Sequence, residues 1–521
     1  MVRIEGLKLA PGQDEQLLRG KAARLLRVPE GDILSLQVLR RAIDAREELH
    51  FVYTAAVTLR QEKAALRRIR DRRVTPYAPE TYRLPEALAA PETPPVVIGA
   101  GPGGLFAALV LARCGLRPII LERGRDAVTR QRDVASFWRT GVLDPESNVQ
   151  FGEGGAGAFS DGKLNTGVNN PRIQWVLEQF VAAGAKEDIL YDAKPHVGTD
   201  ILLAVVQNLR HRIEELGGEV RFHAQVTGLD RENGALTGLR LSDGSKISCD
   251  RAILAIGHSA RDTVTMLHEL GLPMEPKPFA MGVRIEQNQK VIDNAQYGGL
   301  DPKLPAADYK LVAHLQDRTV YTFCMCPGGY VVAAASEAGG VVTNGMSYSG
   351  RKGENANAAL LVSLNPADFP GTDPLSGMRW QREIEEKAFA AGGGNYHAPA
   401  QKVCDFQSHR PSTTPGSVQP TYRPGVTWTD LHEVLPKVLT DALEEALPVL
   451  EKRLPGFAPA DAVLTAPESR SSSPVRLLRD ETRQSALRGL YPAGEGAGYA
   501  GGIMSAAVDG ILCAEALLET L

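Results

Sequence analysis

The amino-acid sequence predicts an α/β fold, and three observations lead to this prediction. An apolar strand, Val96 to Ile98, runs into a glycine-rich loop and an apolar helix, and a second strand then ends in Glu122. A strand, a glycine-rich loop and a helix return in residues 486–521. Between these ends, apolar strands alternate with helical patterns. The pattern is that of a Rossmann-type nucleotide-binding domain, here discontinuous, with an inserted α+β substrate domain and a small N-terminal α/β module.

Length and composition are consistent with several structural units. The chain has 521 residues, which exceeds what one hydrophobic core usually serves. Its 43% hydrophobic and 23% charged residues are ordinary for a globular protein. No stretch approaches the length of a membrane span, and the start lacks the apolar run of a signal peptide. We therefore expect a cytoplasmic protein without a membrane span.

Residues 1–92 are predicted to form the first unit, a small α/β module with a linker. Its strands are expected at 2–10, 33–39 and 49–59, and its helices at 14–26 and 60–70. Proline and alanine are frequent from residue 76 to residue 95, as in an extended linker. The module contains more Lys and Arg than Asp and Glu, although the net charge of the chain is −4. It carries no nucleotide-binding motif.

The second unit, residues 93–270, is predicted to be the first part of the nucleotide-binding domain. Gly99-Ala100-Gly101-Pro102-Gly103-Gly104 fits the pattern G-x-G-x-x-G between a strand and a helix. Gly99 permits the sharp turn, Gly101 lets the backbone approach a pyrophosphate, and Gly104 lets the helix pack closely on the strand. The helix N-terminus offers unpaired N–H groups to the anion. Glu122 is expected to accept hydrogen bonds from the hydroxyls of an adenosine ribose.

Further elements complete this domain and the units after it. Beyond the second strand we expect a helix at 199–216, a strand at 219–227, a hairpin through 236–241 and 246–248, and a strand at 252–256. Residues 271–485 are more irregular, and we assign them to the inserted substrate domain. Residues 486–521 then return to the nucleotide-binding domain.

The final segment decides which dinucleotide is expected. Gly489-Leu490-Tyr491-Pro492-Ala493-Gly494-Glu495-Gly496, followed shortly by Gly501-Gly502-Ile503 and a helix, resembles the second flavin-binding motif of the glutathione-reductase-like flavoprotein superfamily. The resemblance implies FAD, with Glu495 accepting a hydrogen bond from the ribityl chain and the helix N-terminus facing the flavin ring. A positive helix end at that place would stabilise the negative charge of reduced flavin.

Two other strand ends resemble the same superfamily. Val226 matches a position whose backbone contacts adenine in relatives. Asp250 to Gly257 resembles the strand ending in Ala-Thr-Gly at which the chain leaves the FAD domain, although Ile256 replaces the threonine. Only one G-x-G-x-x-G pattern is present, so the second Rossmann domain that glutathione reductase devotes to NADPH is not expected. NAD(P)H remains possible as a transient electron donor.

A closer resemblance covers residues 95–521. The segments that carry it are Asn148–Leu164, Thr322–Gly329, Asn344–Ser347 and Glu468–Arg476. They resemble blocks of bacterial and plastid proteins known as uncharacterised FAD-dependent dehydrogenases, a group of NAD(P)/FAD-dependent oxidoreductases. The resemblance implies that the glycine-dense loop of the first block, with Gly154, Gly155 and Ala156, runs beside the flavin and its pyrophosphate. It supplies a cofactor and an oxidoreductase activity but no substrate.

These motifs define the residues expected to contact FAD, whereas catalytic residues stay unassigned and no metal ligands are predicted. The expected contacts are Gly99, Gly101, Pro102, Gly103, Gly104, Glu122, Arg123, Gly154, Gly155, Ala156, Val226, Gly257, Gly494, Glu495, Gly501, Gly502 and Ile503. One of Arg123, Arg130 and Arg132 could reach a phosphate, although surface exposure is favoured for each. Ser160 and Lys163 would lie near the ring, but a solvated lysine is an equal alternative.

The cysteines offer another candidate for chemistry. The six cysteines are too sparse for a disulfide framework or a paired zinc site. Cys324 and Cys326 are two residues apart, so on a strand they would point to one face, and a disulfide between them would be strained. We favour two buried structural thiols over a redox pair. His258 follows Gly257 and is interpreted as a hydrogen-bonded structural histidine.

The resulting hypothesis is an FAD-dependent oxidoreductase of dehydrogenase or reductase type with a small-molecule substrate. A flavin monooxygenase is the first alternative, although its usual Ala-Asp-Gly segment is replaced by Ala255-Ile256-Gly257. An RNA-associated flavoprotein is the second, because Arg60, Lys63, Arg67 and Arg70 share a helical face. The acidic net charge and the absence of an aromatic stacking motif argue against nucleic acid. A redox sensor that only holds FAD is the third, and the oligomeric state is open.

Overall fold

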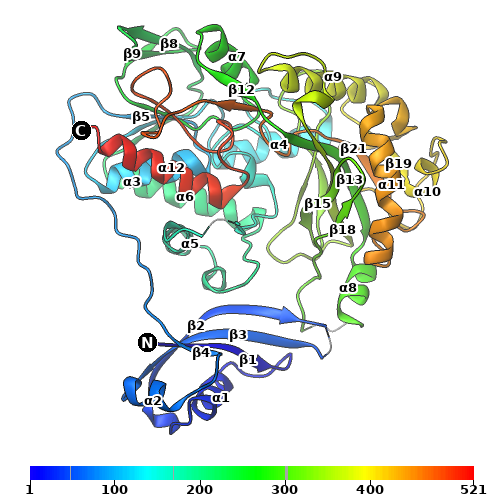
Figure 1. Ribbon diagram of the computed structural model, residues 1–521. Coiled ribbons are helices and arrows are strands. Elements are labelled where there is room, and N and C mark those ends of the chain that lie inside the picture. Colours follow the sequence, from blue (N-terminus) through cyan, green and yellow to red (C-terminus); the bar gives the residue numbers. More distant parts are fainter. Residues whose placement is uncertain (47, 168, 300–302) are drawn as a thin grey trace.

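The computed structural model describes residues 1–521 except 47, 168 and 300–302. It confirms an α/β protein with a Rossmann-type domain, an inserted α+β part and an N-terminal module that forms a separate sheet at one side of the molecule (Figure 1). Among the described residues, no helix combines the length and apolar character needed to cross a membrane.

The N-terminal module is an antiparallel sheet with helices on one side. Its elements are β1 (Val2–Leu9), α1 (Leu17–Leu26), β2 (Ile33–Asp44), β3 (His50–Leu59), α2 (Glu62–Arg68) and β4 (Val74–Pro76). The described strands lie in the order β2-β3-β1-β4. Leu18, Ala22 and Leu26 recur with helical spacing on α1 and are buried against this sheet. The predicted elements are thereby confirmed, with β2 longer than expected.

A parallel sheet forms the centre of the nucleotide-binding domain. Its described strands are β23 (Leu490–Pro492), β11 (Ala252–Leu254), β5 (Val96–Ile98), β6 (Ile119–Leu121) and β7 (Glu219–Arg221), in that order. Every neighbouring pair is parallel. The three inner strands, β11, β5 and β6, are apolar and buried, as is typical of parallel sheets covered on both faces, whereas the edge strand β7 carries Glu219 and Arg221. The last strand of the chain is therefore an edge strand of this sheet and pairs with β11.

Helices cover one face of this sheet and a small antiparallel meander covers the other. The helices are α3 (Pro102–Arg113), α5 (Arg172–Ala182), α6 (Thr199–Glu215) and α12 (Ile503–Leu518), which share one core with β5 and β6. The meander is β8 (Val226–Glu232), β9 (Ala235–Leu241) and β10 (Lys246–Ser248), packed in a second core. Figure 1 shows α3, α6 and α12 side by side, although α12 ends the chain. The site is thus built from both ends of the domain.

The inserted part is a large mixed sheet. Its described strands follow the order β14 (Val312–His314), β15 (Thr319–Cys326), β18 (Asn355–Leu364), β13 (Phe279–Asn288), β21 (Val463–Glu468), β19 (Ala398–Lys402) and β20 (Val426–Trp428). The long helix α11 (Lys437–Arg453) packs on one face and contributes Leu439, Leu443 and Leu450 to the core. A hairpin of β16 (Tyr330–Ala333) and β17 (Thr343–Met346) lies over the same sheet.

The remaining elements link these parts. They are α4 (Ala127–Thr140), α7 (Arg261–Glu269), β12 (Met274–Pro276), α8 (Gln289–Tyr297), α9 (Ser376–Ala391), α10 (Val403–Phe406) and β22 (Val475–Leu477), with short 3-10 turns at Glu30–Asp32, Ala156–Phe159, Glu187–Leu190, Pro366–Asp368 and Leu431–Glu433. β12 pairs antiparallel with β22, so the two segments that join the inserted sheet to the nucleotide-binding domain run side by side.

Two expectations about the chain are wrong in detail. The strand expected at 219–227 is split into β7 and β8, because His223 between them adopts a φ of 55°, outside the range of a strand. The expected linker has no helix or strand from residue 77 to residue 95, but it is not a free spacer along its whole length. Tyr82 donates a hydrogen bond of 2.6 Å to Glu515 on α12, and the Leu88 amide donates to the Cys114 carbonyl at 2.8 Å. Residues 82–88 therefore pack on the nucleotide-binding domain.

Candidate functional site: a cavity between two helix N-termini and the inserted sheet

A cavity of about 660 Å³ opens at the carboxyl ends of β5, β6 and β11. This volume is in the range of ligand and cofactor sites. All but two of the residues expected to contact FAD line it. The carboxyl edge of a parallel sheet is where open α/β folds bind ligands, since the strand order reverses there. The inserted sheet closes the opposite side through Phe323, Cys324 and Asn344.

The two exceptions, Gly104 and Gly154, pack the loops that shape the cavity. A Cβ on Gly104 would lie 1.9 Å from the carbonyl oxygen of Gly99, so this glycine allows α3 to approach β5 as the sequence predicted. A Cβ on Gly154 would lie 3.1 Å from Val206 on α6 and from Ala158. Gly154 packs against α6, whereas the next residue, Gly155, packs against Gly101 and lines the cavity.

The phosphate loop has the geometry that its glycines predict. Gly99 has a φ of 105°, and a Cβ there would lie 2.3 Å from the Ala255 carbonyl. Gly101 is the N-cap of α3, with Pro102 as the first helical residue. Gly101 faces Gly155 across the cavity, where an added Cβ would meet only the Gly155 Cα, at 3.8 Å. The helix N-terminus therefore opens into free space, as an anion site requires.

Glu122 lies at the end of β6 and is almost fully buried. One carboxylate oxygen accepts a hydrogen bond of 2.8 Å from the Ala100 amide. The other accepts from the amides of Gly124, at 2.8 Å, and Gly152, at 3.0 Å. Glu122 thus holds three loops around the cavity together, in addition to lining it. A carboxylate oxygen can accept more than one hydrogen bond, so a ribose hydroxyl can still be accommodated.

The arginines after Glu122 have structural partners. Arg130 is fully buried and donates to the carbonyls of Asn148, Val149, Gly152 and Glu153, so the expectation of surface exposure is wrong for it. It is buried because it satisfies the otherwise unpaired carbonyls of the glycine-dense loop. Arg123 lines the cavity, but Glu146 and Asp262 bind its guanidinium at 2.9 Å. Arg132 is exposed, as expected.

The second helix N-terminus comes from the end of the chain. Gly502 is the N-cap of α12, and Gly501, Gly502 and Ile503 line the cavity. A Cβ on Gly501 or Gly502 would meet no atom within 4 Å, so these residues border open space. Glu495 also lines the cavity, and burial raises its pKa to about 7. Two positive helix ends and an acid with a raised pKa thus face one space.

The wall formed by the inserted sheet contains an unusual thiol. Cys324 lines the cavity with a φ of 41°, at a bulge that interrupts β15 between Phe323 and Cys326. A hydrogen bond from the Cys326 thiol, with the charges of Lys163 and Arg284, lowers the pKa of Cys324 to about 6 against the effect of burial. Cys326 is buried, as expected, whereas Cys324 is only partly buried.

Charged groups surround this thiol. Arg284 is fully buried, forms an ion pair of 2.9 Å with Glu468 and donates to the Cys324 carbonyl at 2.9 Å. Burial opposes the charge of Lys163, but the negative charge of Asp161, 3.5 Å away, raises the pKa of this lysine. The Lys163 ammonium is buried, lines the cavity and makes no hydrogen bond in the described part of the chain. It is therefore available to a ligand anion.

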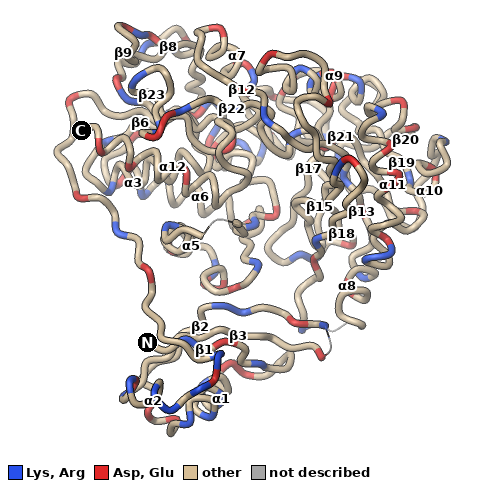
Figure 2. Tube along the Cα trace, viewed as in Figure 1, with Lys and Arg blue, Asp and Glu red and all other residues tan. Residues whose placement is uncertain are grey.

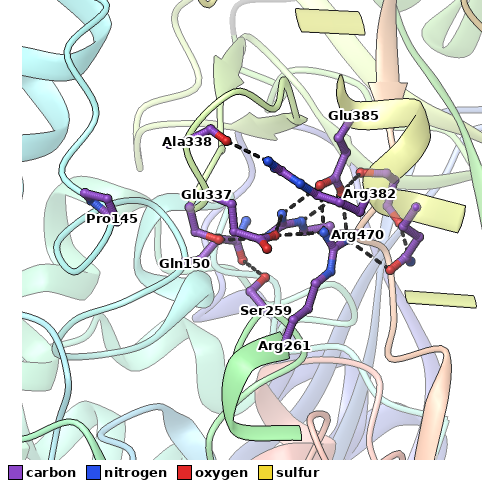
Figure 3. Close-up of polar contacts among 12 residues, drawn as sticks. Pro145, Gln150, Ser259, Arg261, Glu337, Ala338, Arg382, Glu385 and Arg470 are labelled. Carbon is purple, nitrogen blue, oxygen red and sulfur yellow. Dashed lines mark hydrogen bonds and ion pairs between the residues drawn. The ribbon is translucent and has the colours of Figure 1, made fainter. Parts of the chain in front are cut away.

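A network of ion pairs joins the inserted part to the nucleotide-binding domain beside the cavity (Figure 3). Arg261 on α7 and Arg470 after β21 both bind Glu385 and Glu337, with shortest N–O distances between 2.6 and 2.8 Å. Figure 3 shows the two guanidinium groups converging on these carboxylates. Burial, with the charges of Arg470 and Arg261, lowers the pKa of His258 to about 4. His258 is therefore neutral, contacts the Ser259 hydroxyl at 3.0 Å and lines the cavity.

The residues present fit FAD. The glycine-rich loop at the N-terminus of α3 suits a pyrophosphate. Glu122, after β6, and Val226, at the start of β8, suit an adenosine. The second helix N-terminus, at Gly502, and the acid Glu495 lie on the same cavity and suit the flavin half. Sequence reasoning placed Asn344, Glu468 and Arg470 in family-like blocks without assigning them to the site, and it missed Lys310. No local motif shows which loops of the inserted part face the cofactor.

Comparisons with known families agree with this reading. Residues 92–257 match a family described as FAD binding domain, and residues 202–348 match one described as FAD dependent oxidoreductase. Residues 278–471 match the C-terminal domain-like family of FAD-dependent proteins, and residues 1–58 match a domain of unknown function. The protein is thus an FAD-dependent oxidoreductase with FAD as its cofactor.

The particular family is defined by a full-length relative. An uncharacterized protein of Clostridium beijerinckii is 46% identical over 526 residues, covering 99% of this chain and 98% of the relative. The chain belongs to the same family as that protein. Among solved structures, glycine oxidase from Bacillus cereus is 12% identical, with 82% of this chain and 96% of that chain covered and a TM-score of 0.32. A geranylgeranyl bacteriochlorophyll reductase-like protein from Thermoplasma acidophilum is 13% identical, with 83% and 80% covered and a TM-score of 0.37.

Proposed function

We propose that the protein transfers a hydride or an electron pair between FAD and a small polar substrate, with FAD held as in the glutathione-reductase-like superfamily. The observation that carries this proposal is the single cavity onto which α3, α12, Glu122 and the inserted sheet all open. When bound, FAD supplies a reversible two-electron acceptor. The polypeptide supplies binding, orientation and charge.

In this proposal the two helix ends bind different parts of the cofactor. The N-terminus of α3, with Gly101, binds the pyrophosphate, and Glu122 accepts hydrogen bonds from the ribose hydroxyls. The N-terminus of α12, with Gly502, stabilises negative charge on the flavin ring, and Glu495 accepts a hydrogen bond from the ribityl chain. The buried ion pairs around Glu385 fix the inserted part relative to this cradle, which is the FAD-binding surface formed by the N-termini of α3 and α12.

The substrate is proposed to bind between this cradle and the wall formed by β15 and β17. Lys163 presents a buried ammonium without a hydrogen bond in the described part of the chain, so an anionic or strongly polar substrate group is favoured there. Asn344 provides an amide on the same wall. His258 is neutral and can accept or donate one hydrogen bond.

The test begins with the cofactor. Heat-released flavin from the purified protein should be FAD, because the α3 loop and Glu122 suit an adenosine diphosphate half. Small carboxylates, amino acids and hydroxy acids are then added anaerobically, and bleaching of the flavin absorbance identifies a reducing substrate. NADH and NADPH are included as donors. FMN, or no flavin after reconstitution, would contradict the proposal.

Thiol oxidation is a second candidate, favoured by the position of Cys324 in the cavity wall beside the Cys326 thiol. Anaerobic alkylation of the FAD-free protein with iodoacetamide should show a half-maximal rate near pH 6 at Cys324, and at higher pH in Lys163→Met. Cys326 should react slowly because it is fully buried. Cys324→Ser with unchanged flavin reduction by every donor would exclude a redox role for the thiol.

Oxygen separates the dehydrogenase proposal from the monooxygenase alternative. A dehydrogenase or reductase should oxidise its substrate anaerobically with a supplied electron acceptor. Oxygen consumption coupled one-to-one to substrate hydroxylation would instead support a monooxygenase.

The location and macromolecular partners also remain proposals. We propose a cytoplasmic protein that does not bind nucleic acid. Figure 2 shows Lys and Arg gathered around α2 of the N-terminal module, with Arg67 and Arg68 on the helix itself. Salt-sensitive retention of RNA by the full chain, lost on replacing Arg67 and Arg68 by Gln, would overturn this view.

A further inference from the structure

A cluster of two histidines and a glutamate lies outside the FAD cavity. His409 follows α10, His432 lies in the turn Leu431–Glu433, and Glu444 is on α11. Figure 1 shows α10 at the outer side of the inserted part, next to α11 and β19. None of the three residues is among the described residues that line the cavity. The oxidoreductase proposal therefore does not account for them.

The three side chains converge on one point. Nε2 of His409 lies 2.8 Å and Nε2 of His432 lies 2.9 Å from the same oxygen, Oε1 of Glu444. All three potential ligand atoms lie within 4.8 Å of one another. Tetrahedral zinc with bonds of roughly 2.0–2.1 Å would space such atoms about 3.3 Å apart. Small outward shifts of the side chains would therefore admit an ion.

A fourth residue orients His432 from behind. Nδ1 of His432 lies 2.7 Å from Oδ1 of Asp430. A carboxylate only accepts hydrogen bonds, so Nδ1 carries the proton, and neutral His432 then points the lone pair of Nε2 at an oxygen of Glu444. A metal ion between these two atoms would bind both of them. A carboxylate behind a histidine is also the usual arrangement at metal sites.

The surroundings hold the rings in place and leave one side open. The His432 ring stacks on Phe406 with centroids 4.5 Å apart and on His409 with centroids 4.3 Å apart. His432 is 17% exposed and Glu444 is 26% exposed, whereas His409 is 64% exposed. Solvent can thus reach the cluster from the His409 side and supply a further ligand. Nitrogen and carboxylate donors of this kind suit Zn²⁺.

We propose that His409, His432 and Glu444 form a zinc-binding site, with Asp430 as the residue that positions His432. The ion fastens the loop after α10 to α11 and to the turn at Leu431–Glu433. These three segments are separated in sequence, and the turn at Leu431–Glu433 contacts both β19 and α11. Because folding brings the ligands together, the ion should stabilise the folded protein.

The experiment uses the full-length, FAD-loaded protein freed of metals with EDTA and then of EDTA by dialysis. Zinc chloride is titrated calorimetrically into the wild type, His409→Ala, Glu444→Gln and a control, His211→Ala, which removes an exposed histidine on α6. The wild type and the control should bind one more equivalent of zinc than the two site variants. The difference design separates this ion from any zinc held by other thiols or histidines.

Thermal unfolding gives the second readout. Excess zinc should raise the unfolding midpoint of the wild type and of His211→Ala, and should leave His409→Ala unchanged. His409→Ala is expected to fold because this side chain is largely exposed on a loop. Equal zinc stoichiometry in the wild type and His409→Ala would overturn the proposal, and so would loss of the equivalent in His211→Ala. Either result would leave the cluster as side-chain contacts of two histidines with Glu444 and no metal ion.

Discussion

At the scale of single residues, a side chain at Gly101 tests where the pyrophosphate binds. An added Cβ would make only an ordinary contact with the protein, 3.8 Å from the Gly155 Cα, but the larger side chain would extend into the cavity. We predict that Gly101→Val folds normally and loses FAD, because the branched side chain occupies the space of the pyrophosphate. The ratio of flavin to protein absorbance measures retention, and circular dichroism measures folding. Full FAD occupancy in a folded variant would show that the pyrophosphate lies elsewhere.

Glu495 should couple FAD binding to pH. Burial raises its pKa to about 7, above the value of an exposed glutamate. The contribution of Glu495 to the free energy of unfolding of the FAD-free protein therefore falls as pH rises from 4.5 towards 7. A ribityl hydroxyl that donates to the carboxylate would favour ionisation. FAD affinity in the wild type should therefore rise with pH through about 7, with release of a proton on binding.

Glu495→Gln tests this coupling. It should bind FAD more weakly at pH 8, by about 1–3 kcal/mol for a lost hydrogen bond to a charged group. It should also show no proton release in calorimetric titrations run in two buffers of different ionisation enthalpy. The same pH dependence in both proteins would assign the proton to another group.

Most of the residues that the sequence predicted to contact FAD line the cavity, but the sequence did not show how each one is used. Glycines at fixed spacing between a strand and a helix determine a local backbone path, so Gly99, Gly101 and Gly104 could be assigned tasks in advance. Arg130 could not, because its four carbonyl partners are known only once the following loop has folded around it. For Cys324, the bulge in β15 defeats the alternation rule on which the expectation rested.

At the scale of elements, the crossing of α3 and α12 ties the two halves of the cradle together. A Cβ on Gly510 of α12 would lie 2.0 Å from the Gly103 carbonyl oxygen of α3. We predict that Gly510→Ala forces the helices apart and destabilises the protein by about 1–3 kcal/mol, as overpacking commonly does. The midpoint of heat-induced flavin release, followed by fluorescence, should fall.

A matched glycine provides the control for this substitution. Gly31 in the N-terminal module has no atom within 4 Å of an added Cβ. Gly31→Ala should therefore change the midpoint little, within about 0.5 kcal/mol. An unchanged midpoint in Gly510→Ala would mean that the crossing relaxes at no cost.

At the scale of the whole molecule, the N-terminal module contacts the rest of the chain through few groups. Arg41 on β2 binds Asp192 through two hydrogen bonds, of 2.7 and 3.0 Å, and its amide donates to the Tyr191 carbonyl. Tyr82 and the residues up to Leu88 instead pack on α12 and α3. The division of the chain predicted from composition placed the boundary near residue 92, and the contacts favour a cut near residue 77.

The final prediction concerns the dependence of FAD binding on the two ends of the chain. A chain ending at Ser485 should lose FAD although it keeps the phosphate loop, because β23 pairs with β11 and α12 supplies the second helix N-terminus. Asp509 on α12 also accepts the Gly494 amide at 2.8 Å, which fixes the loop before Glu495. Circular dichroism should show that the inserted sheet, with its own core, still folds.

Removal of residues 1–76 is the control of the opposite kind. This deletion keeps Tyr82 and all the lining of the cavity, so the protein should stay yellow. Removal of residues 1–90 should also retain FAD but lower the unfolding midpoint, because it removes the packing of Tyr82 on Trp175 and its hydrogen bond to Glu515. A yellow chain truncated at Ser485, or a folded but colourless chain without residues 1–76, would contradict a cradle closed by the last strand and helix.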